Sequence, residues 1–242
     1  MAERGRVRVE PAQKRVRALL AGHTVLDTQR ALLVWESPYY PQYYIPRVDV
    51  HADLKSTGQV KRSPSRGDAE VFDVVVEGHS VSEAAWQGQG SPIEELRDSV
   101  RFDWGSLDAW FEEDEEVFIH PRSPYTRIDV LPSSRHVRVE GHGVVVAESV
   151  RPVVLFETGL PPRYYLPKSD VRMDLLLPSA TRTGCPYKGE AEYWSIRLDA
   201  RDIPDAAWSY RTPLQESARI AGLVSFTSWV DGVDVIVDDE SV

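Results

Sequence analysis

Short apolar runs separated by glycine and proline recur along the whole chain. Residues 137–140 and 144–147 are rich in valine, and the glycine turn 141–143 joins them, which predicts a β-hairpin. Residues 32–35 and 153–156 are almost wholly apolar, as expected of central strands. The pattern therefore predicts a protein built mainly from β-strands.

Two longer stretches and two turns complete the predicted elements. Residues 190–198 alternate, so that every second side chain from Trp194 shares one face of a strand, and residues 68–76 do the same. In 91–94 and 212–215 a hydroxyl residue precedes proline, and Glu or Gln follows three residues after the hydroxyl, which is typical of a helix start. We expect domains built as a curved sheet or half-barrel, each with one short α-helix.

The chain contains the same pattern twice. Residues 17–54 match residues 138–175 without a gap, at a shift of 121 positions, and the match continues at shifts of 122 and then 121 as far as Pro213. Its most similar segments, 36–50 and 157–171, are rich in tyrosine and proline. A repeat this long, present twice, indicates two folded domains and not a solenoid.

The repeat divides the chain into two domains and a connector. We expect a first β domain over 1–119, a proline-rich linker over 120–135 that is semi-rigid, and a second β domain over 136–242. The two domains are expected to pack with approximate two-fold symmetry, in a monomer or in a homodimer.

Composition narrows the classes of partner. The net charge of −10 argues against nucleic acid, whose binding proteins have basic surfaces. Cys185 is the only cysteine, so the sequence offers neither a disulfide nor a cysteine-based zinc site. Residues 1–6 lack the apolar start of a signal peptide, and no apolar run reaches membrane-spanning length, so we expect a cytoplasmic protein without membrane contact. The absence of asparagine and the 17 prolines suit a thermophile, although GC-rich coding gives a similar bias.

Several motifs resemble one family. They are Glu157-Thr-Gly-Leu-Pro-Pro-Arg-Tyr-Tyr-Leu-Pro167, Thr183-Gly-Cys-Pro-Tyr-Lys-Gly189, Trp208-Ser-Tyr210, Asp103-Trp104 and His120-Pro-Arg122. Together they are similar to the DUF427 family in its tandem bacterial form. The resemblance implies compact all-β domains of a fold compared with the zinc-bearing Mss4-like (β-tent-like) group. Since this chain lacks that group's cysteine pairs, we expect neither a metal nor a cofactor.

The two copies differ in the short motif that ends at Gly67 in copy one and at Gly189 in copy two. Copy two has Cys185-Pro-Tyr-Lys-Gly189, and copy one has Ser63-Pro-Ser-Arg-Gly67. If the motif carries a site, the second domain is the better candidate. Cys185 could be a nucleophile whose pKa is lowered by Lys188, or a small buried cysteine beside a lysine that extends to solvent.

Charged residues occupy matching positions in both copies, and two interpretations remain open. They either form ion pairs in every such domain, or line a pocket in which Glu157 or Asp170 acts as a base. The matched pairs are Arg30/Arg151, Glu36/Glu157, Asp49/Asp170 and Asp53/Asp174.

Aromatic residues in proline-rich loops predict a cavity with aromatic walls in the second domain, near the repeat interface. The candidate contacts of a small polar or anionic ligand are Glu157, Arg163, Tyr164, Tyr165, Asp170, Tyr187, Lys188, Tyr193, Trp208 and Tyr210. Candidate catalytic residues are Glu157, Asp170, Cys185 and Lys188.

Three functions follow as hypotheses. The first is a small-molecule binding protein, and the second is an enzyme acting on a small anionic or nucleotide-like substrate. The third is a protein-interaction scaffold that uses its aromatic loops. One label of the resembled family mentions nucleotidyltransferases, and Gly105-Ser106 with 114–116 echoes their metal-binding carboxylates, although a solvated acidic turn explains the same residues.

Overall fold

The computed structural model describes residues 7–198 and 201–242. Residues 1–6, which the sequence suggests are not a signal peptide, lie outside the described part. The chain divides into two compact units, Met1–Ser123 and Pro124–Val242. No helix of the described residues is long and apolar enough to cross a membrane.

Each unit is made of antiparallel strands, as the apolar pattern predicts. The strands of the first are β1 (Arg8–Pro11), β2 (Val16–Leu20), β3 (His23–Thr28), β4 (Leu32–Trp35), β5 (Gln42–Pro46), β6 (Asp53–Lys61), β7 (Ala69–Val76), β8 (His79–Gln87), β9 (Ser99–Phe102), β10 (Ala109–Glu112) and β11 (Glu115–Val117). Those of the second are β12 (Ile128–Pro132), β13 (Val137–Gly141), β14 (Val144–Ser149), β15 (Val153–Glu157), β16 (Arg163–Tyr165), β17 (Leu176–Cys185), β18 (Gly189–Leu198), β19 (Arg201–Ser209), β20 (Val224–Phe226), β21 (Val233–Val237) and β22 (Glu240–Ser241).

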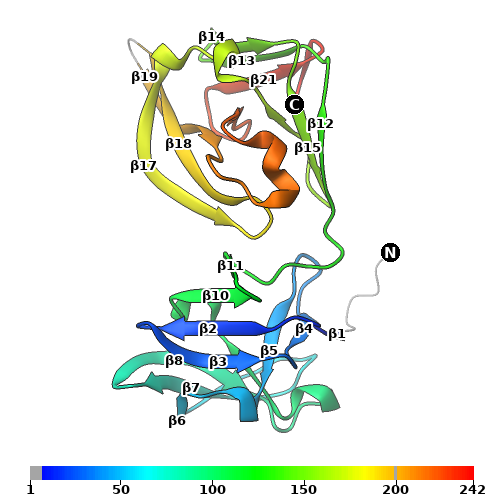
Figure 1. The fold of residues 1–242 in the computed structure, drawn as a ribbon, viewed down its shortest axis with the longest axis vertical. Coiled ribbons are helices and arrows are strands. Elements are labelled where there is room, and N and C mark those ends of the chain that lie inside the picture. Colours follow the sequence, from blue (N-terminus) through cyan, green and yellow to red (C-terminus); the bar gives the residue numbers. More distant parts are fainter. Residues whose placement is uncertain (1–6, 199–200) are drawn as a thin grey trace. The chain divides into compact units, whose positions relative to one another are not determined.

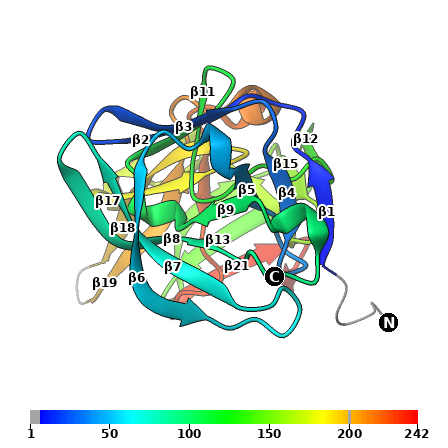
Figure 2. The ribbon, with the colours of Figure 1, turned by 90° about the horizontal axis from the view of Figure 1, so that it is seen from below.

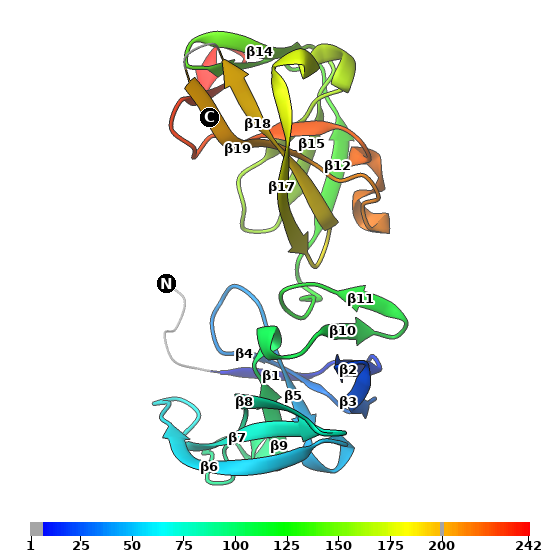
Figure 3. The same cartoon turned by 90° about the vertical axis from the view of Figure 1, so that its left-hand side faces the viewer.

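The two domains share one topology, which confirms the tandem duplication. The first has a sheet of order β1-β4-β5-β9-β8-β7-β6 and a smaller sheet of order β11-β10-β2-β3 (Figures 1 and 3). In the second, β12-β15-β16 and β17-β18-β19-β20 correspond to the larger sheet, joined by the bridge between Leu166 and Val224. The order β14-β13-β21-β22 corresponds to the smaller one. None of these described sheets closes into a barrel.

Each core lies between the two sheets of its own domain. In the first domain it joins Val16 and Ala18 of β2 to Val74 of β7 and Val100 of β9. Figure 2 views this domain from the side of its β6–β7 hairpin. In the second domain Val137 and Val139 of β13 occupy the same positions, and Trp194 and Ile196 face them from β18, as the alternation predicts. Apolar burial on one face of each sheet is therefore the main stabilising interaction.

The predicted hairpin over 137–147 is present. Strands β13 and β14 are joined by His142 and Gly143, which have φ of 46° and 79°. Two successive residues with positive φ give the tight turn whose twist matches that of paired strands. Histidine adopts positive φ more often than most residues and glycine adopts it freely, so His142-Gly143 meets that requirement with little strain.

The short helices occur where they were expected, but they are 3-10 turns and not α-helices. They are η2 (Glu94–Leu96) and η6 (Gln215–Ile220), and neither has a side-chain cap on its first turn. The Ser91 hydroxyl instead accepts a hydrogen bond from the Ile93 backbone N–H at 3.2 Å. Further 3-10 turns are η1 (Arg47–Asp49), η3 (Trp104–Ser106), η4 (Lys168–Asp170) and η5 (Met173–Leu175). Segments this short favour the tighter helix.

The proposed connector over 120–135 contains regular structure. Its residues Ile128–Pro132 form β12, which pairs with β15 as an edge strand of the second domain. Pro132 ends this strand, at an edge where proline is tolerated because no neighbour needs its missing N–H.

Candidate functional site

A glutamate at the end of the second strand of each large sheet is a charged centre in both domains. In the second domain the Lys188 Nζ donates to Glu157 Oε2 at 2.5 Å, and about a tenth of each side chain is exposed. In the first, Glu36 Oε1 lies 2.9 Å from Arg101 Nε, and Arg66 lies 3.4 Å from the other oxygen. The Tyr44 hydroxyl donates to Glu36 at 2.8 Å. Arg66 of the Ser63–Gly67 motif and Lys188 of the Cys185–Gly189 motif therefore pair with the corresponding glutamate, Glu36 or Glu157, of their own domain.

An aromatic cluster lies near the glutamate of the second domain. Tyr165, Trp208 and Tyr210 are buried together, and half-buried Cys185 packs against them. The Trp208 Nε1–H donates to the Tyr165 hydroxyl at 3.4 Å. Burial raises the pKa of both the Tyr165 and the Tyr210 phenol above the ordinary value, so both stay neutral. The structure thus brings together six of the residues singled out from the sequence.

The remaining candidates lie around or away from this cluster. Tyr193 packs at its edge, with its hydroxyl 2.9 Å from that of Thr183, and the Tyr187 carbonyl accepts from the Ser217 hydroxyl at 3.2 Å. Asp170 is elsewhere, where it pairs with Arg151 at 2.7 Å and accepts from Ser149 at 2.8 Å.

The first domain repeats the aspartate site, with Asp49 bound by Arg30 and Thr28. In both copies this aspartate ties its 3-10 turn, η1 or η4, to the end of strand β3 or β14. Because its oxygens are already held by an arginine and a hydroxyl, the geometry is that of a structural ion pair.

The space beside Glu36 is an open pocket of about 260 Å³ in the first domain. The strand registers place Gly88 where the second domain has Tyr210, because Glu70 faces Gln87 as Glu192 faces Ser209. Gly88 lines the pocket, whereas Tyr210 fills its own cluster. Gly88 therefore leaves space open at the position where the second domain has the Tyr210 side chain.

A different pocket, of about 400 Å³, opens in the second domain. Its lining is mostly apolar, and it includes Arg163 and the exposed indole of Trp229. The lining consists of Val137, Val139, Pro161, Pro162, Arg163, Tyr164, Leu166, Phe226, Ser228, Trp229, Val235 and Val242. Arg163 and Tyr164 are the two sequence candidates that line it.

In the first domain two tryptophans fill the corresponding space. Trp110 faces Ala18 across β10 and β2, and Val235 faces Val139 at the same register position. The backbone N–H of Asp103 bonds the Ala84 carbonyl as that of Thr227 bonds Ala206, so Trp104 corresponds to Ser228. The rings of Trp104 and Trp110 stack with centroids 4.8 Å apart. Each domain thus opens a pocket where its twin has large aromatic side chains.

Arg163 gives the second-domain pocket its charge. Its guanidinium lies over the Trp229 ring, 4.6 Å from the centroid, and burial lowers its pKa below the ordinary value. An arginine so placed remains charged near neutral pH. Among the described residues it forms no ion pair, so a half-buried cation faces the pocket without a carboxylate partner.

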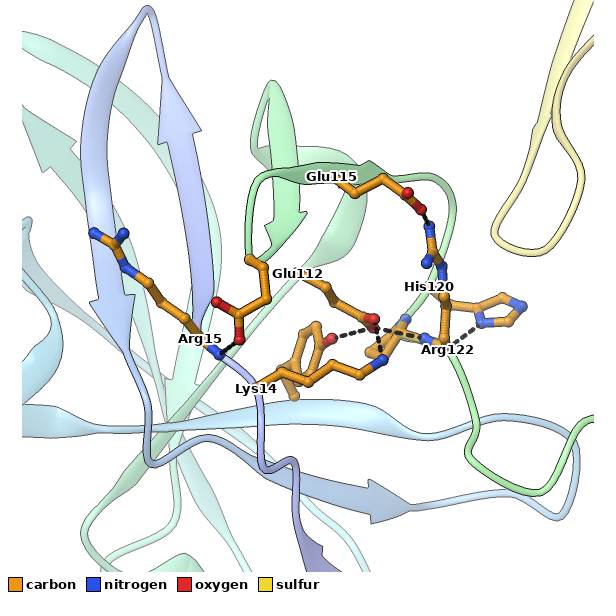
Figure 4. A network of polar contacts seen from close by, with 9 residues as sticks. Lys14, Arg15, Glu112, Glu115, His120 and Arg122 are labelled. Carbon is orange, nitrogen blue, oxygen red and sulfur yellow. Dashed lines mark hydrogen bonds and ion pairs between the residues drawn. The ribbon is translucent and has the colours of Figure 1, made fainter. Parts of the chain in front are cut away.

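The acidic residues 113–116 after β10 are exposed, as expected of a solvated turn, whereas Glu112, the last residue of β10, is buried. Glu112 is only 4% exposed and accepts hydrogen bonds from the Tyr43 hydroxyl at 2.6 Å, from Lys14 at 2.5 Å and from the Arg122 backbone N–H at 3.2 Å (Figure 4). The Arg122 side chain pairs with Glu115. Glu112 therefore holds the segment that leaves the first domain.

Two further residues of the segment 120–135 make contacts inside their own domains. The His120 ring stacks on Tyr40 at 4.2 Å, within the first domain, and Arg127 pairs with Asp129 at 2.9 Å within the second. Across residues 7–198 and 201–242, no group of three or more His, Cys, Asp or Glu side chains is arranged to hold a metal ion.

Sequence reasoning missed the residues that shape both pockets. Trp229, Lys61 and Arg101 have no matching residue type in the other copy, so the repeat did not draw attention to them. Trp104 and Trp110 were visible as aromatics, but their role appears only when they are compared with Ser228 and Val235. Copy two has three more residues than copy one before β20 and one more before β21, and these insertions hide that correspondence in the sequence.

The comparisons with known proteins agree with the duplicated fold. The profile of the family described as "Domain of unknown function (DUF427)" matches residues 8–113 and again residues 129–239. A search of curated proteins found no match. The two matched segments cover most of the chain and coincide with its two β domains. The chain therefore belongs to the DUF427 family, as a tandem two-domain member.

Proposed function

We propose that this protein binds a small molecule in the second-domain pocket lined by Arg163, Tyr164 and Trp229. The observation that carries the proposal is the comparison of the two domains. The same backbone positions hold Trp104 and Trp110 in one copy and Ser228 and Val235 in the other, where a pocket of about 400 Å³ remains. This volume is typical of small-molecule sites.

The shape of the space favours a flat, apolar ligand body. Two stacked indoles occupy it in the first domain, between Tyr43 and Phe102. Their counterparts Tyr164 and Phe226 line the pocket. Aromatic walls favour offset or edge contacts with a ring, which add to the gain from apolar burial.

The charge favours one anionic group on that ligand. Arg163 is the charged side chain of the lining, and its planar guanidinium can bind a carboxylate through two parallel hydrogen bonds. Stacking on Trp229 limits its rotamers, so less entropy is lost on binding. We therefore expect a small aromatic or branched anion.

The enzymatic and scaffold hypotheses lack an observation of equal weight. Glu157 and Lys188 are bonded to each other, and Cys185 packs in an apolar cluster. Binding is thus the function that the geometry supports best.

Isothermal titration of the full chain with indole-3-acetate and with neutral 3-methylindole tests the proposal. We expect both to bind, the anion about tenfold more tightly, since it adds a charge-assisted contact. Arg163→Gln should remove that difference, whereas Arg197→Gln, which changes an exposed cation of the same domain, should leave it intact. No binding at millimolar concentrations, or an unchanged preference in Arg163→Gln, would contradict the proposal.

A further inference from the structure

The first domain carries a second and chemically different pocket. It lies beside Glu36, has a volume of about 260 Å³ and is lined by four cationic side chains, Lys61, Arg62, Arg66 and Arg101. We propose that this pocket binds a small dianion, with the chemistry shared by phosphomonoesters and short dicarboxylates. This inference does not rest on the function proposed for the second domain.

The first argument is the charge left over after internal pairing. Glu36 is paired with Arg66 and Arg101, at 3.4 and 2.9 Å. Lys61 and Arg62 form no ion pair among the described residues, and both belong to the lining. One carboxylate therefore faces four cations, and the excess favours a ligand with two negative charges over a neutral or cationic one.

Trp86 holds two of these cations in place. The Lys61 Nζ lies 3.5 Å from its ring centroid, and the Arg101 guanidinium carbon lies 4.3 Å from it. Cation–π contacts of this kind restrict long side chains that are otherwise mobile. Cations fixed in this way lose less entropy when they bind an anion.

The second domain has the same strand frame but different residues at most of the positions that line this pocket. The pairing of β6 with β7 and of β17 with β18 places Thr183 where the first domain has Lys61, and Gly184 where it has Arg62. Tyr210 stands in place of Gly88, and Ser225 in place of Arg101. Lys61, Arg62 and Arg101 thus have no cationic counterpart in the second domain, whereas Arg66 corresponds to Lys188. The strand frame therefore does not require these three cations or the open space beside them.

The pocket is too small for a large ligand, and its two cations without an ion pair among the described residues, Lys61 and Arg62, are consecutive in the chain at the end of β6. Its volume lies below the usual range for drug-sized ligands. Glu36 would repel an anionic group placed deep beside it, so the negative charges should lie near Lys61 and Arg62. The Ser63 hydroxyl, also in the lining, can donate to the same oxygens.

Titration of the full chain with inorganic phosphate, glycerol phosphate and succinate at low ionic strength tests the inference. We expect at least one of them to bind, and Lys61→Gln to weaken it about tenfold, as expected for one lost charge-assisted contact. Lys61 is exposed, so this variant should fold. Lys55→Gln changes an exposed lysine of the same strand outside the lining and should bind normally.

A filling variant separates the pocket from surface charge. Gly88→Tyr introduces the side chain of the second domain, keeps every cation and should abolish binding; its folding is checked by circular dichroism. Preference for the phosphates or for succinate identifies the ligand class. Failure of all three probes to bind, or binding that both Lys61→Gln and Gly88→Tyr leave unchanged, would overturn the inference. Indole-3-acetate binding should be unaffected by either variant, which keeps the two sites distinguishable.

Discussion

Trp104 and Trp110 stack with their ring centroids 4.8 Å apart, and together they fill in the first domain the space that is an open pocket in the second. The Trp110 Nε1–H also donates to the Trp104 carbonyl at 3.2 Å. The two indoles therefore pack in the core of the first domain. The second domain has smaller side chains at both positions, and the pocket occupies the space that these indoles would fill.

Trp110→Val should destabilise the first domain. The indole is 3% exposed and packs in the main core, so its loss should lower the free energy of unfolding by about 3 kcal/mol. Urea titration monitored by circular dichroism measures this. Trp229→Val removes an indole that is 61% exposed and should cost less than about 1 kcal/mol. Equal effects of the two variants would show that Trp110 does not fill a core.

Much of the fold follows from the sequence because strand pairing repeats with the duplication. The turn at His142 and Gly143 needs two positive φ angles, and a glycine between two valine-rich runs predicts such a turn. The short helices were expected as α-helices because proline and a hydroxyl mark a helix start. Segments as short as Glu94–Leu96 cannot form the bonded turns that an α-helix needs.

The sites could be predicted only in part. Arg163 and Tyr164 do line a pocket, but the segment between Thr212 and Val233 is longer than its counterpart in copy one. Trp110 and Val235 therefore occupy corresponding positions in the two domains but do not align when the two copies are compared by sequence alone. The burial of Glu112 could not be predicted, because four further acidic residues follow it and suggest an exposed segment. Its burial depends on partners distant in sequence, Lys14 and Tyr43, which no local pattern reveals.

Lys188→Met should destabilise the second domain because it leaves Glu157 charged and enclosed without its partner. We expect a loss of about 3 kcal/mol in the free energy of unfolding. The double variant Glu157→Gln/Lys188→Met should recover part of that loss. A double-mutant cycle by urea unfolding gives the coupling energy. A coupling near zero would argue that this pair is not structural and would return Glu157 and Lys188 to the catalytic candidates.

Asp170→Asn should reduce the acid sensitivity of folding. The Arg151 guanidinium, with Ser149, holds the pKa of Asp170 below its ordinary value. The ionised carboxylate therefore stabilises the fold above about pH 4, and that contribution is lost as the pH falls towards the folded-state pKa. Urea midpoints between about pH 5 and pH 2 should fall less steeply in the variant. Asp231→Asn, at an exposed position, should keep the wild-type slope, and a wild-type slope in Asp170→Asn would refute the assignment.

Glu112→Val should release the segment around Arg122. Val237 occupies the corresponding position in the second domain, so the strand tolerates valine. The variant removes the acceptor of the Arg122 backbone N–H and of Tyr43 (Figure 4). Trypsin should then cleave after Arg122 about tenfold faster, because cleavage follows the population of the open form. Unchanged cleavage, with Glu113→Gln as a control at an exposed neighbour, would show that Glu112 does not hold this segment.

The most direct test of the central claim is the affinity of Val235→Trp for indole-3-acetate. This substitution places in the second domain the indole that Trp110 provides in the first. If the open space at Val235 is the binding site, wild type binds and the folded variant does not, while the neighbouring exposed change Asp234→Asn leaves affinity unchanged. Equal affinity of wild type and Val235→Trp would contradict the claim that this pocket is the site.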